Sequence, residues 1–442
     1  SMGVMVGGVA GKFLAHWMTH GAPPMDALAI DSRRFGSWAD RDYRVAKAVE
    51  CFGLQFGVHY PHEERPAGRG LRLSPLHDLM LDRGAVMGAA HGWERPNWIS
   101  ATPGAVADET FRRANWFDAV GAEVQAATKR VAMADLSVFS KFEVTGTEVG
   151  PFLEALAANR APKPGRIGLT HALTPAGGVL SEFSVARLAE DHAYLTSAAA
   201  AQEIDLDLLR RAAAGFDVAV SDMTEDLAVI GLMGPMAPKV LPELADMSWL
   251  TVREAMVGDL AVRTLRVSYI GEAGWELHVA PAHAVALFRA LEDRATPHGL
   301  GFYGAYAANA MRLENVYRGW GSDLTTERSP LEAGLTPFVR TELRDGLGRE
   351  NPWDMVLLEI EAGEIDPFYA HTLWQSDRPV GIVTSGAYGH RTGKVLALAY
   401  LRDPSARTGL TVSILGQHRA ATILTTPAFD PDNTRMKSGG RT

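Results

Sequence analysis

The chain has very little cysteine: of its 442 residues only Cys51 carries a thiol. A single cysteine excludes an internal disulfide and any zinc site built from several thiolates. This composition fits a reducing compartment, and we therefore expect a cytoplasmic location. Because Cys51 continues the helical apolar pattern of "KAVECFGLQF", we expect a small buried side chain rather than a nucleophile.

Excess positive charge and long apolar runs are also missing. Lys and Arg total 43 against 52 Asp and Glu, which gives a net charge of −9. Such a field repels polyanions, so nucleic acid is not expected as a partner. No run of about 18 apolar residues indicates a membrane helix. With 47% hydrophobic and 21% charged residues, the composition is that of a globular protein of several domains.

Complete nucleotide-binding and hydrolase motifs are absent. The glycine-rich start "VMVGGVAGKF" places Val6 and Phe13 where a phosphate loop needs glycine and a hydroxyl residue. A dinucleotide fingerprint needs a complete strand before it, and only the stub Gly3 to Gly8 is present. We predict a helix from about Gly11 to Thr19, entered through glycines that allow close packing. No GxSxG elbow occurs, and the histidines lack ligand spacing, so no metal site is expected.

The rest of the chain alternates helical and strand patterns without the regular period of a doubly wound sheet. Strands joined by turns at 175–178 and 190–191 predict an antiparallel meander. After about Val339, short β-branched runs between turns are typical of a small sandwich or barrel. These patterns favour an α+β fold over α/β.

The segment "TPAGGVLSEFSV" (174–185) is the first candidate for chemistry. Its glycines turn the chain, and alternate residues of the following strand share a face, so Glu182 and Ser184 lie together. A carboxylate on a strand interior is costly unless it is solvated or hydrogen bonded. The alternative is the exposed face of a half-buried strand.

The hairpin "SYIGEAGWEL" (268–277) is the second candidate. Tyr269 and Glu276 bracket a predicted four-residue turn, so we expect them near each other across paired strands. A carboxylate there could accept two parallel N–H bonds from a flat amidine-like edge. The alternative for Glu276 is a surface salt bridge, and Trp275 is expected on the opposite, buried face.

A third candidate follows a predicted helix in "AMRLENVYRGWGSDLTTERSPLEAGL" (310–335). The chain leaves the helix through Gly-Trp-Gly and presents the flat Trp320 beside the polar Ser322 and Asp323. Taken alone, each of the three segments is a weak signal.

Together, in this order and followed by "VTSGAYGHRTGKVLALAYL" (383–401), they resemble the aminomethyltransferase family, the T-protein of the glycine cleavage system and its relatives. The chain is most similar to the folate-binding C-terminal half of dimethylglycine and sarcosine dehydrogenases. The resemblance implies an α+β, three-domain cloverleaf fold that ends in an antiparallel β-barrel and follows a small mixed α/β module.

The same resemblance implies a division of the chain. The expected parts are a flavin-domain edge (1–22), a connecting α/β module (23–104), the folate-binding domain (105–338), the barrel (339–430) and a disordered tail (431–442). No flavin-binding domain is recognised, so no FAD is expected in this chain alone. A separate flavoprotein partner is left open.

The resemblance also assigns site residues. Glu276 and Tyr269 match the family's pterin-binding positions, and Glu182 falls on the acidic position that serves proton transfer. Ser184, Trp320 and Tyr388 are expected to line the pocket. The chain carries glutamate at 182 where T-proteins have aspartate, and it departs from them again at Ala198 and Ala308.

The implied function is tetrahydrofolate-dependent capture of a one-carbon unit from a methylated amine, such as dimethylglycine or sarcosine, as methylene-tetrahydrofolate. Two alternatives stay open. One is methyl transfer from a sulfonium such as dimethylsulfoniopropionate, and the other is a non-catalytic folate-binding subunit of a flavin-dependent dehydrogenase.

Overall fold

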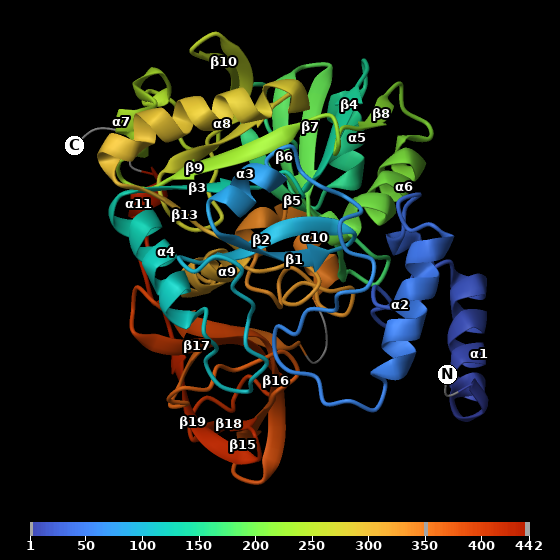
Figure 1. Cartoon of the computed structure of the whole chain (residues 1–442). Coiled ribbons are helices and arrows are strands. Elements are labelled where there is room, and N and C mark those ends of the chain that lie inside the picture. The colour runs from blue at the N-terminus through green and yellow to red at the C-terminus, as the bar shows by residue number, and fades with distance from the viewer. Residues whose placement is uncertain (1–2, 349–351, 438–442) are drawn as a thin grey trace.

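The computed structural model describes residues 3–348 and 352–437. The chain opens with helices α1 (Gly3–His20) and α2 (Arg41–Gly53). A short helix α3 (His77–Asp82) and the hairpin β1 (Ala85–Ala90) and β2 (Trp93–Ile99) follow. Figure 1 draws α1 and α2 along one edge of the molecule, away from the barrel.

Helix α1 differs from the sequence prediction at its start. It begins at Gly3, so the expected stub before Gly11 is helical as well. The glycines do not serve close packing, since a Cβ added at Gly7, Gly8 or Gly11 would meet no atom within 4 Å. Val9 and Met18 are 71% and 78% exposed and lie on opposite sides of the helix, so α1 leaves apolar side chains bare on more than one side.

A six-stranded sheet has the order β10-β11-β12-β9-β3-β13. Its strands are β3 (Val131–Asp135), β9 (Ala228–Met233), β10 (Val252–Val257), β11 (Leu260–Leu265), β12 (Gly274–Val279) and β13 (Leu300–Phe302). Helices α7 (Ala237–Val240) and α8 (Pro281–Ala295) cover one face, and Trp275 packs there at 1% exposure, as predicted.

A five-stranded sheet has the order β5-β6-β7-β4-β8. Its strands are β4 (Ser140–Thr145), β5 (Ile167–Leu173), β6 (Val179–Ala189), β7 (His192–Ser197) and β8 (Ala219–Asp222). Strands β5, β6 and β7 form the predicted antiparallel meander. Helices α5 (Val149–Leu156) and α6 (Gln202–Ala213) cover its outer face with an apolar cluster that includes Phe183 and Val185.

The inner faces of the two sheets pack on each other. Tyr194 of β7 and His278 of β12 join them through a hydrogen bond of 2.9 Å between the hydroxyl and Nδ1. Ala186 and Leu265 belong to the same buried cluster between the sheets. Because alternate strand residues share a face, Glu182 and Ser184 point to the side of Ala186, and Glu276 to the side of His278.

The remaining elements connect these sheets to a closed six-stranded barrel. Its strands are β14 (Asp354–Ile360), β15 (Thr372–Gln375), β16 (Arg378–Gly389), β17 (Lys394–Leu401), β18 (Leu410–Ile414) and β19 (Gln417–Leu424). Helix α9 (Ala305–Glu314) packs against β16 and against α4 (Phe117–Lys129), and α10 (Thr341–Arg344) precedes the barrel. The α+β class and the C-terminal barrel are confirmed (Figure 1).

Two local expectations are wrong. The predicted disordered tail is ordered through Lys437: helix α11 (Thr434–Lys437) buries Met436, and the Tyr317 hydroxyl bonds Asn433 Oδ1 at 2.5 Å. Residues 438–442 lie outside the described part. Cys51 is exposed rather than buried, as no residue of α2 is buried.

Candidate functional site

Glu182 lies on β6 directly opposite His171 of β5. His171 Nε2 is 2.9 Å from Glu182 Oε2, and the histidine is fully buried whereas 22% of the Glu182 side chain is exposed. The bond holds one carboxylate oxygen against the sheet. Because the side chain keeps partial exposure, the other oxygen remains available to a ligand or solvent.

Glu276 occupies the matching place on the inner face of β12. His278 Nε2 is 3.6 Å from Glu276 Oε2, and 21% of the Glu276 side chain is exposed. The Tyr194 hydroxyl occupies the other ring nitrogen of His278, and burial lowers the pKa of this histidine. A neutral ring that accepts from Tyr194 turns its Nε2–H toward Glu276. The two glutamates thus project from facing sheets, each beside a buried histidine.

Tyr269 is not placed as the hairpin pattern predicted. Strand β11 ends at Leu265 and Glu276 pairs with Leu265, so Tyr269 lies in the connecting loop rather than across a strand pair. The glycines serve close approach instead of a tight turn: an added Cβ would lie 2.0 Å from Asn315 Nδ2 at Gly271, and 2.1 Å from Leu232 O at Gly274.

The loop brings Tyr269 to the third candidate segment instead. Its hydroxyl donates to Arg318 O at 3.2 Å, and the charge of Glu182 acts on both Tyr269 and Arg318. Tyr269 is 43% exposed, so part of its ring faces open space. The predicted pairing of Tyr269 with Glu276 across two strands is therefore wrong, and the assignment of Tyr269 to the pterin site stays a prediction.

The Gly-Trp-Gly segment closes over the start of β6. Trp320 Nε1 donates to Leu180 O at 3.1 Å, two residues before Glu182. Gly178 approaches the same segment so closely that an added Cβ would lie 1.8 Å from Thr326 O. Val179 N also donates to Thr325 O at 3.1 Å. The first and third candidate segments are therefore one structural unit.

Asp323, singled out as a polar residue of that segment, is an internal anchor. It is fully buried and ion-paired with Arg312, and its oxygens accept from Gly319 N at 2.8 Å, Thr384 Oγ1 at 2.5 Å and Ser385 Oγ at 2.7 Å. With every lone pair engaged, it fixes the Trp320 turn to β16 and has no capacity left for a ligand.

The other two predicted residues have different surroundings. Ser184 lies on the Glu182 face of β6, half-buried and paired in register with Thr196. Tyr388 contacts Arg113 and Phe117, its ring centroid 5.2 Å from that of Phe117. Its described contacts lie at the junction of α4 and the barrel, and none of them is with the other predicted site residues.

Sequence reasoning missed His171, His278 and Tyr194. His171 could have been found, because it and Glu182 flank the Thr174–Gly178 turn at positions that an antiparallel pair brings opposite each other. Tyr194 and His278 belong to different sheets, so no local pattern links them.

Within residues 3–348 and 352–437, no group of three or more His, Cys, Asp or Glu residues is arranged to hold a metal ion. In the same part of the chain no helix combines the length and the apolar character needed to cross a bilayer.

Three family models match the chain. The GCVT N-terminal domain matches residues 76–342, and the glycine cleavage T-protein C-terminal barrel domain matches 354–430. A model described as the FAD dependent oxidoreductase central domain matches residues 20–74.

Whole-chain comparisons agree. The chain is 34% identical to mitochondrial dimethylglycine dehydrogenase of Rattus norvegicus over 99% of its own length and 54% of that protein. It is 31% identical to an aminomethyltransferase of Streptomyces coelicolor, over 68% of this chain and 87% of that one. The aminomethyltransferase structure from Bartonella henselae superposes with a TM-score of 0.69 at 22% identity, covering 81% of this chain and 98% of that chain.

The chain spans about half the length of the curated dehydrogenases it matches. The match to the GCVT model covers more than half of the chain and includes the two sheets, both glutamates and the Gly-Trp-Gly segment. This protein therefore belongs to the glycine cleavage T-protein, or aminomethyltransferase, family and is homologous to the dimethylglycine and sarcosine dehydrogenases.

Proposed function

We propose that this chain transfers a one-carbon unit to tetrahydrofolate. The observation that carries the proposal is the pair of half-buried glutamates, Glu182 and Glu276, on facing inner sheet surfaces, each backed by a buried histidine. Bound folate supplies the nitrogens that take up the one-carbon unit. The residues present fit such a ligand, because a pterin edge offers the parallel N–H donors that a carboxylate accepts.

In this proposal Glu276 and Glu182 have separate tasks. Glu276 accepts N–H bonds from the pterin edge, while the buried His278 lies beside its carboxylate. Glu182 takes a proton from a folate nitrogen as the carbon–nitrogen bond forms, which is the work of a positioned general base. His171 holds Glu182 in place for that step, and Tyr269, Trp320 and Ser184 bound the same space.

We infer a methylated amine as the source of the one-carbon unit. The support is the similarity to enzymes named dimethylglycine dehydrogenase and sarcosine dehydrogenase, which extends over 99% of this chain. A separate flavoprotein must first oxidise the N-methyl group by two electrons to an iminium or formaldehyde, and capture of that unit by this chain then gives methylene-tetrahydrofolate as the expected product. Methyl-tetrahydrofolate would instead indicate direct methyl transfer from a donor such as a sulfonium.

A flavoprotein partner fits the surface of α1 and α2. Besides Val9 and Met18, α2 exposes Val49 and Phe52 at 69% and 66%. The oxidoreductase central-domain model matches the segment that contains α2. Exposed apolar surface of this kind marks an interaction site, and we propose that it receives a flavin-binding domain.

We propose the cytoplasm as the location. The exposed Cys51 is the only thiol of the chain, and a solvent-facing thiol stays reduced in a reducing compartment. Fluorescence microscopy of a fusion to the full chain tests this.

The test of the proposed function is titration with tetrahydrofolate. Wild type should bind, and Glu276→Ala should weaken binding about tenfold or more, since hydrogen bonds to a charged acceptor are among the strong ones. Glu254→Ala, which removes an exposed glutamate from the same sheet, is the matched control and should bind like wild type. No binding by wild type, or equal binding by Glu276→Ala, contradicts the assignment.

A further inference from the structure

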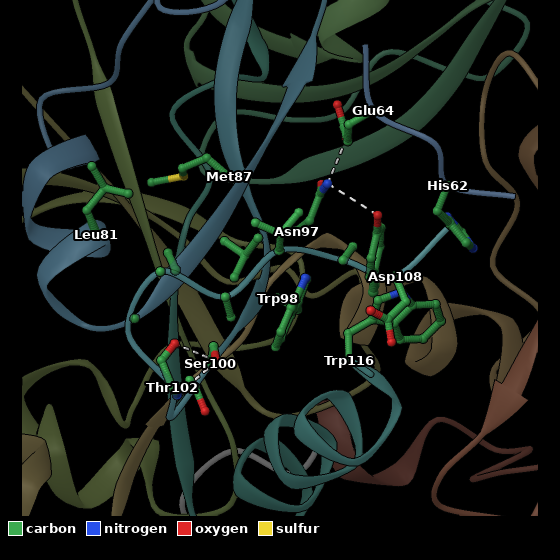
Figure 2. A pocket seen from close by; sticks show the side chains of 18 of the residues that line it. His62, Glu64, Leu81, Met87, Asn97, Trp98, Ser100, Thr102, Asp108 and Trp116 are labelled. Carbon is green, nitrogen blue, oxygen red and sulfur yellow. Dashed lines mark hydrogen bonds between the residues drawn. The ribbon is translucent and has the colours of Figure 1, made fainter. Parts of the chain in front are cut away.

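A cavity of about 950 Å³ lies outside the predicted folate site. Its walls are the β1–β2 hairpin, the segments 61–69 and 100–109, and Trp116 and Tyr306. None of the six predicted site residues lines it. Figure 2 shows the space between the hairpin, the end of α3 at Leu81 and Trp116. Its volume lies at the upper end of the range that small-molecule sites occupy.

Among the described residues that line this cavity, Asn97 and Trp98 each keep one buried polar atom without a hydrogen bond, the acceptor Asn97 Oδ1 and the donor Trp98 Nε1. Asn97 is 3% exposed, and its Nδ2 donates to Glu64 Oε1 at 2.7 Å and to the Tyr306 hydroxyl at 3.3 Å (Figure 2). Because the carboxylate only accepts, the amide must turn its NH₂ toward Glu64. Asn97 Oδ1 is then a buried acceptor without a hydrogen bond. Such an atom costs stability unless a ligand or water donates to it.

The Glu64–Asn97 pair is held rigidly. Glu64 Oε2 accepts from Ala89 N at 3.0 Å, so both carboxylate oxygens are fixed. The pair fits only because residue 88 is glycine: an added Cβ would lie 2.1 Å from Asn97 Nδ2 and 2.2 Å from Glu64 Oε1. The unpartnered oxygen therefore has one fixed position in the cavity wall.

The charge of the lining favours a cation. The carboxylates are Glu63, Glu64, Asp82, Asp108 and Glu109, against two arginines, Arg69 and Arg83. Both arginines are engaged, Arg69 with Glu94 and Arg83 with Glu292. Asp82, Asp108 and Glu109 are exposed and form no ion pair within the described residues. Exposed side chains that all carry a negative charge raise the local concentration of positively charged ligands.

Two neighbouring cations act against this field, and the first is Arg65, whose Nε lies 3.8 Å from Glu63 Oε1. The second, Arg95 of β2, lies close enough to Glu64 to interact with its charge, and burial lowers the pKa of Arg95. The exposed carboxylates Asp82, Asp108 and Glu109 have no such ion pair among the described residues.

Aromatic rings complete the site. The Tyr306 and Trp116 ring centroids are 4.9 Å apart, and that of His62 is 4.7 Å from Tyr306. Aromatic faces stabilise an alkylammonium group through the ring quadrupole, and the apolar remainder of the wall accepts an alkyl or aryl body.

We propose that this cavity is a second small-molecule site, which binds a protonated alkylamine whose N–H donates to Asn97 Oδ1. The inference does not rest on the proposed function, because it needs neither folate nor one-carbon transfer.

Calorimetric titration of the full chain without folate, using three probes of similar shape, tests the proposal. Dimethylbenzylammonium carries charge and an N–H donor, benzyltrimethylammonium carries charge without a donor, and 2-methyl-1-phenylpropan-2-ol carries an O–H donor without charge. We expect dimethylbenzylammonium to bind most tightly and each of the other two probes to bind about tenfold more weakly, because each lacks one of the two features. Absence of binding at about 10 mM dimethylbenzylammonium, or equal binding of the alcohol, overturns the proposal.

Two variants test the two parts of the proposed site separately, the hydrogen bond to Asn97 Oδ1 and the negative charge of Glu64. Asn97→Ala should weaken dimethylbenzylammonium about tenfold and leave benzyltrimethylammonium little changed. Glu64→Gln removes the charge and keeps one acceptor oxygen for Asn97 Nδ2, while its NH₂ replaces the oxygen that accepts from Ala89 N. It should weaken both cations but not the alcohol. If Asn97→Ala does not fold, Glu64→Gln still decides whether charge matters. Cation affinities unchanged in Glu64→Gln overturn the site.

A folate-site control separates the two proposals. Glu276→Ala should bind the amine like wild type, and Glu64→Gln should bind tetrahydrofolate like wild type. If the wild-type protein binds the amine but not tetrahydrofolate, the proposed function is refuted and the amine site stands. If Glu276→Ala loses amine binding, the claim that the two sites are separate is overturned.

Discussion

His171 and Glu182 face each other across β5 and β6, with His171 Nε2 2.9 Å from Glu182 Oε2 and the histidine fully buried. A buried imidazole has little freedom to move, so the bond restricts the carboxylate to one orientation. Small misplacements of a reacting group cost large factors in rate. The relationship makes His171 a positioning residue for Glu182.

We expect His171→Ala to lower kcat by about tenfold to a hundredfold while changing folate affinity little, because Glu182 loses its orientation. His171→Gln, whose amide nitrogen can replace Nε2 as donor, should recover most of the loss. The measurement is methylene-tetrahydrofolate formation from formaldehyde above the uncatalysed rate. If the Gln and Ala variants are equally slow, the hydrogen bond does not orient the carboxylate.

The site was predictable where residues close in sequence meet in one motif, as in the turn that presents Glu182. It was not predictable where the partner comes from another sheet, as with Tyr194 and His278. The error over Tyr269 has a physical cause: Gly271 and Gly274 suggest a tight turn, but their missing Cβ atoms make room for Asn315 and for β9.

Elements of the fold, like residues of the site, were predictable where the interacting residues lie close together in the sequence. Alternation and turn residues predicted the meander, because β5, β6 and β7 pair with near neighbours in sequence. They also indicated the barrel strands, although not the long-range pairings of β14 with β17 and β19. The order of the tail through Lys437 was not predictable. It depends on Tyr317 and Glu272, residues more than a hundred positions away that bind Asn433 and Arg435.

Asp323→Asn should destabilise the protein by about 3 kcal/mol, because it leaves the buried Arg312 without its charged partner. Urea unfolding of the two proteins measures the difference. Ser322→Ala, one residue earlier and partly exposed, is the control, with an expected change within about 0.5 kcal/mol. A loss no larger than that of the control would show that the Asp323 network does not fix the Trp320 turn.

Glu123 should make stability depend on pH. Burial raises the pKa of Glu123 to about 8, although its oxygens accept from Ile99 N at 2.6 Å and Gly304 N at 2.8 Å. Between the unfolded pKa near 4.5 and the folded value, the native state holds a proton that the unfolded chain has released. Stability therefore falls as pH rises through this window.

The Glu123→Gln variant isolates this dependence. Its unfolding free energy should change less than that of wild type between about pH 5 and about pH 8, since its side chain does not titrate. Urea unfolding at both values measures the slopes. Parallel slopes for the two proteins would mean that Glu123 is ionised in the folded state throughout.

The glycines of α1 provide the last prediction. Gly8→Ala should stabilise the helix by about 0.5–1 kcal/mol, because alanine restricts the unfolded backbone and its Cβ meets no neighbour. Gly84→Ala is the contrasting variant: Gly84 has φ +84°, and its Cβ would lie 2.1 Å from Ser100 O, so it should destabilise. Hydrogen exchange of the α1 amides should slow in Gly8→Ala. Faster exchange would mean that residue 8 is packed against a surface, and part of the exposed apolar surface of α1 proposed for a flavin-binding domain would then already be covered.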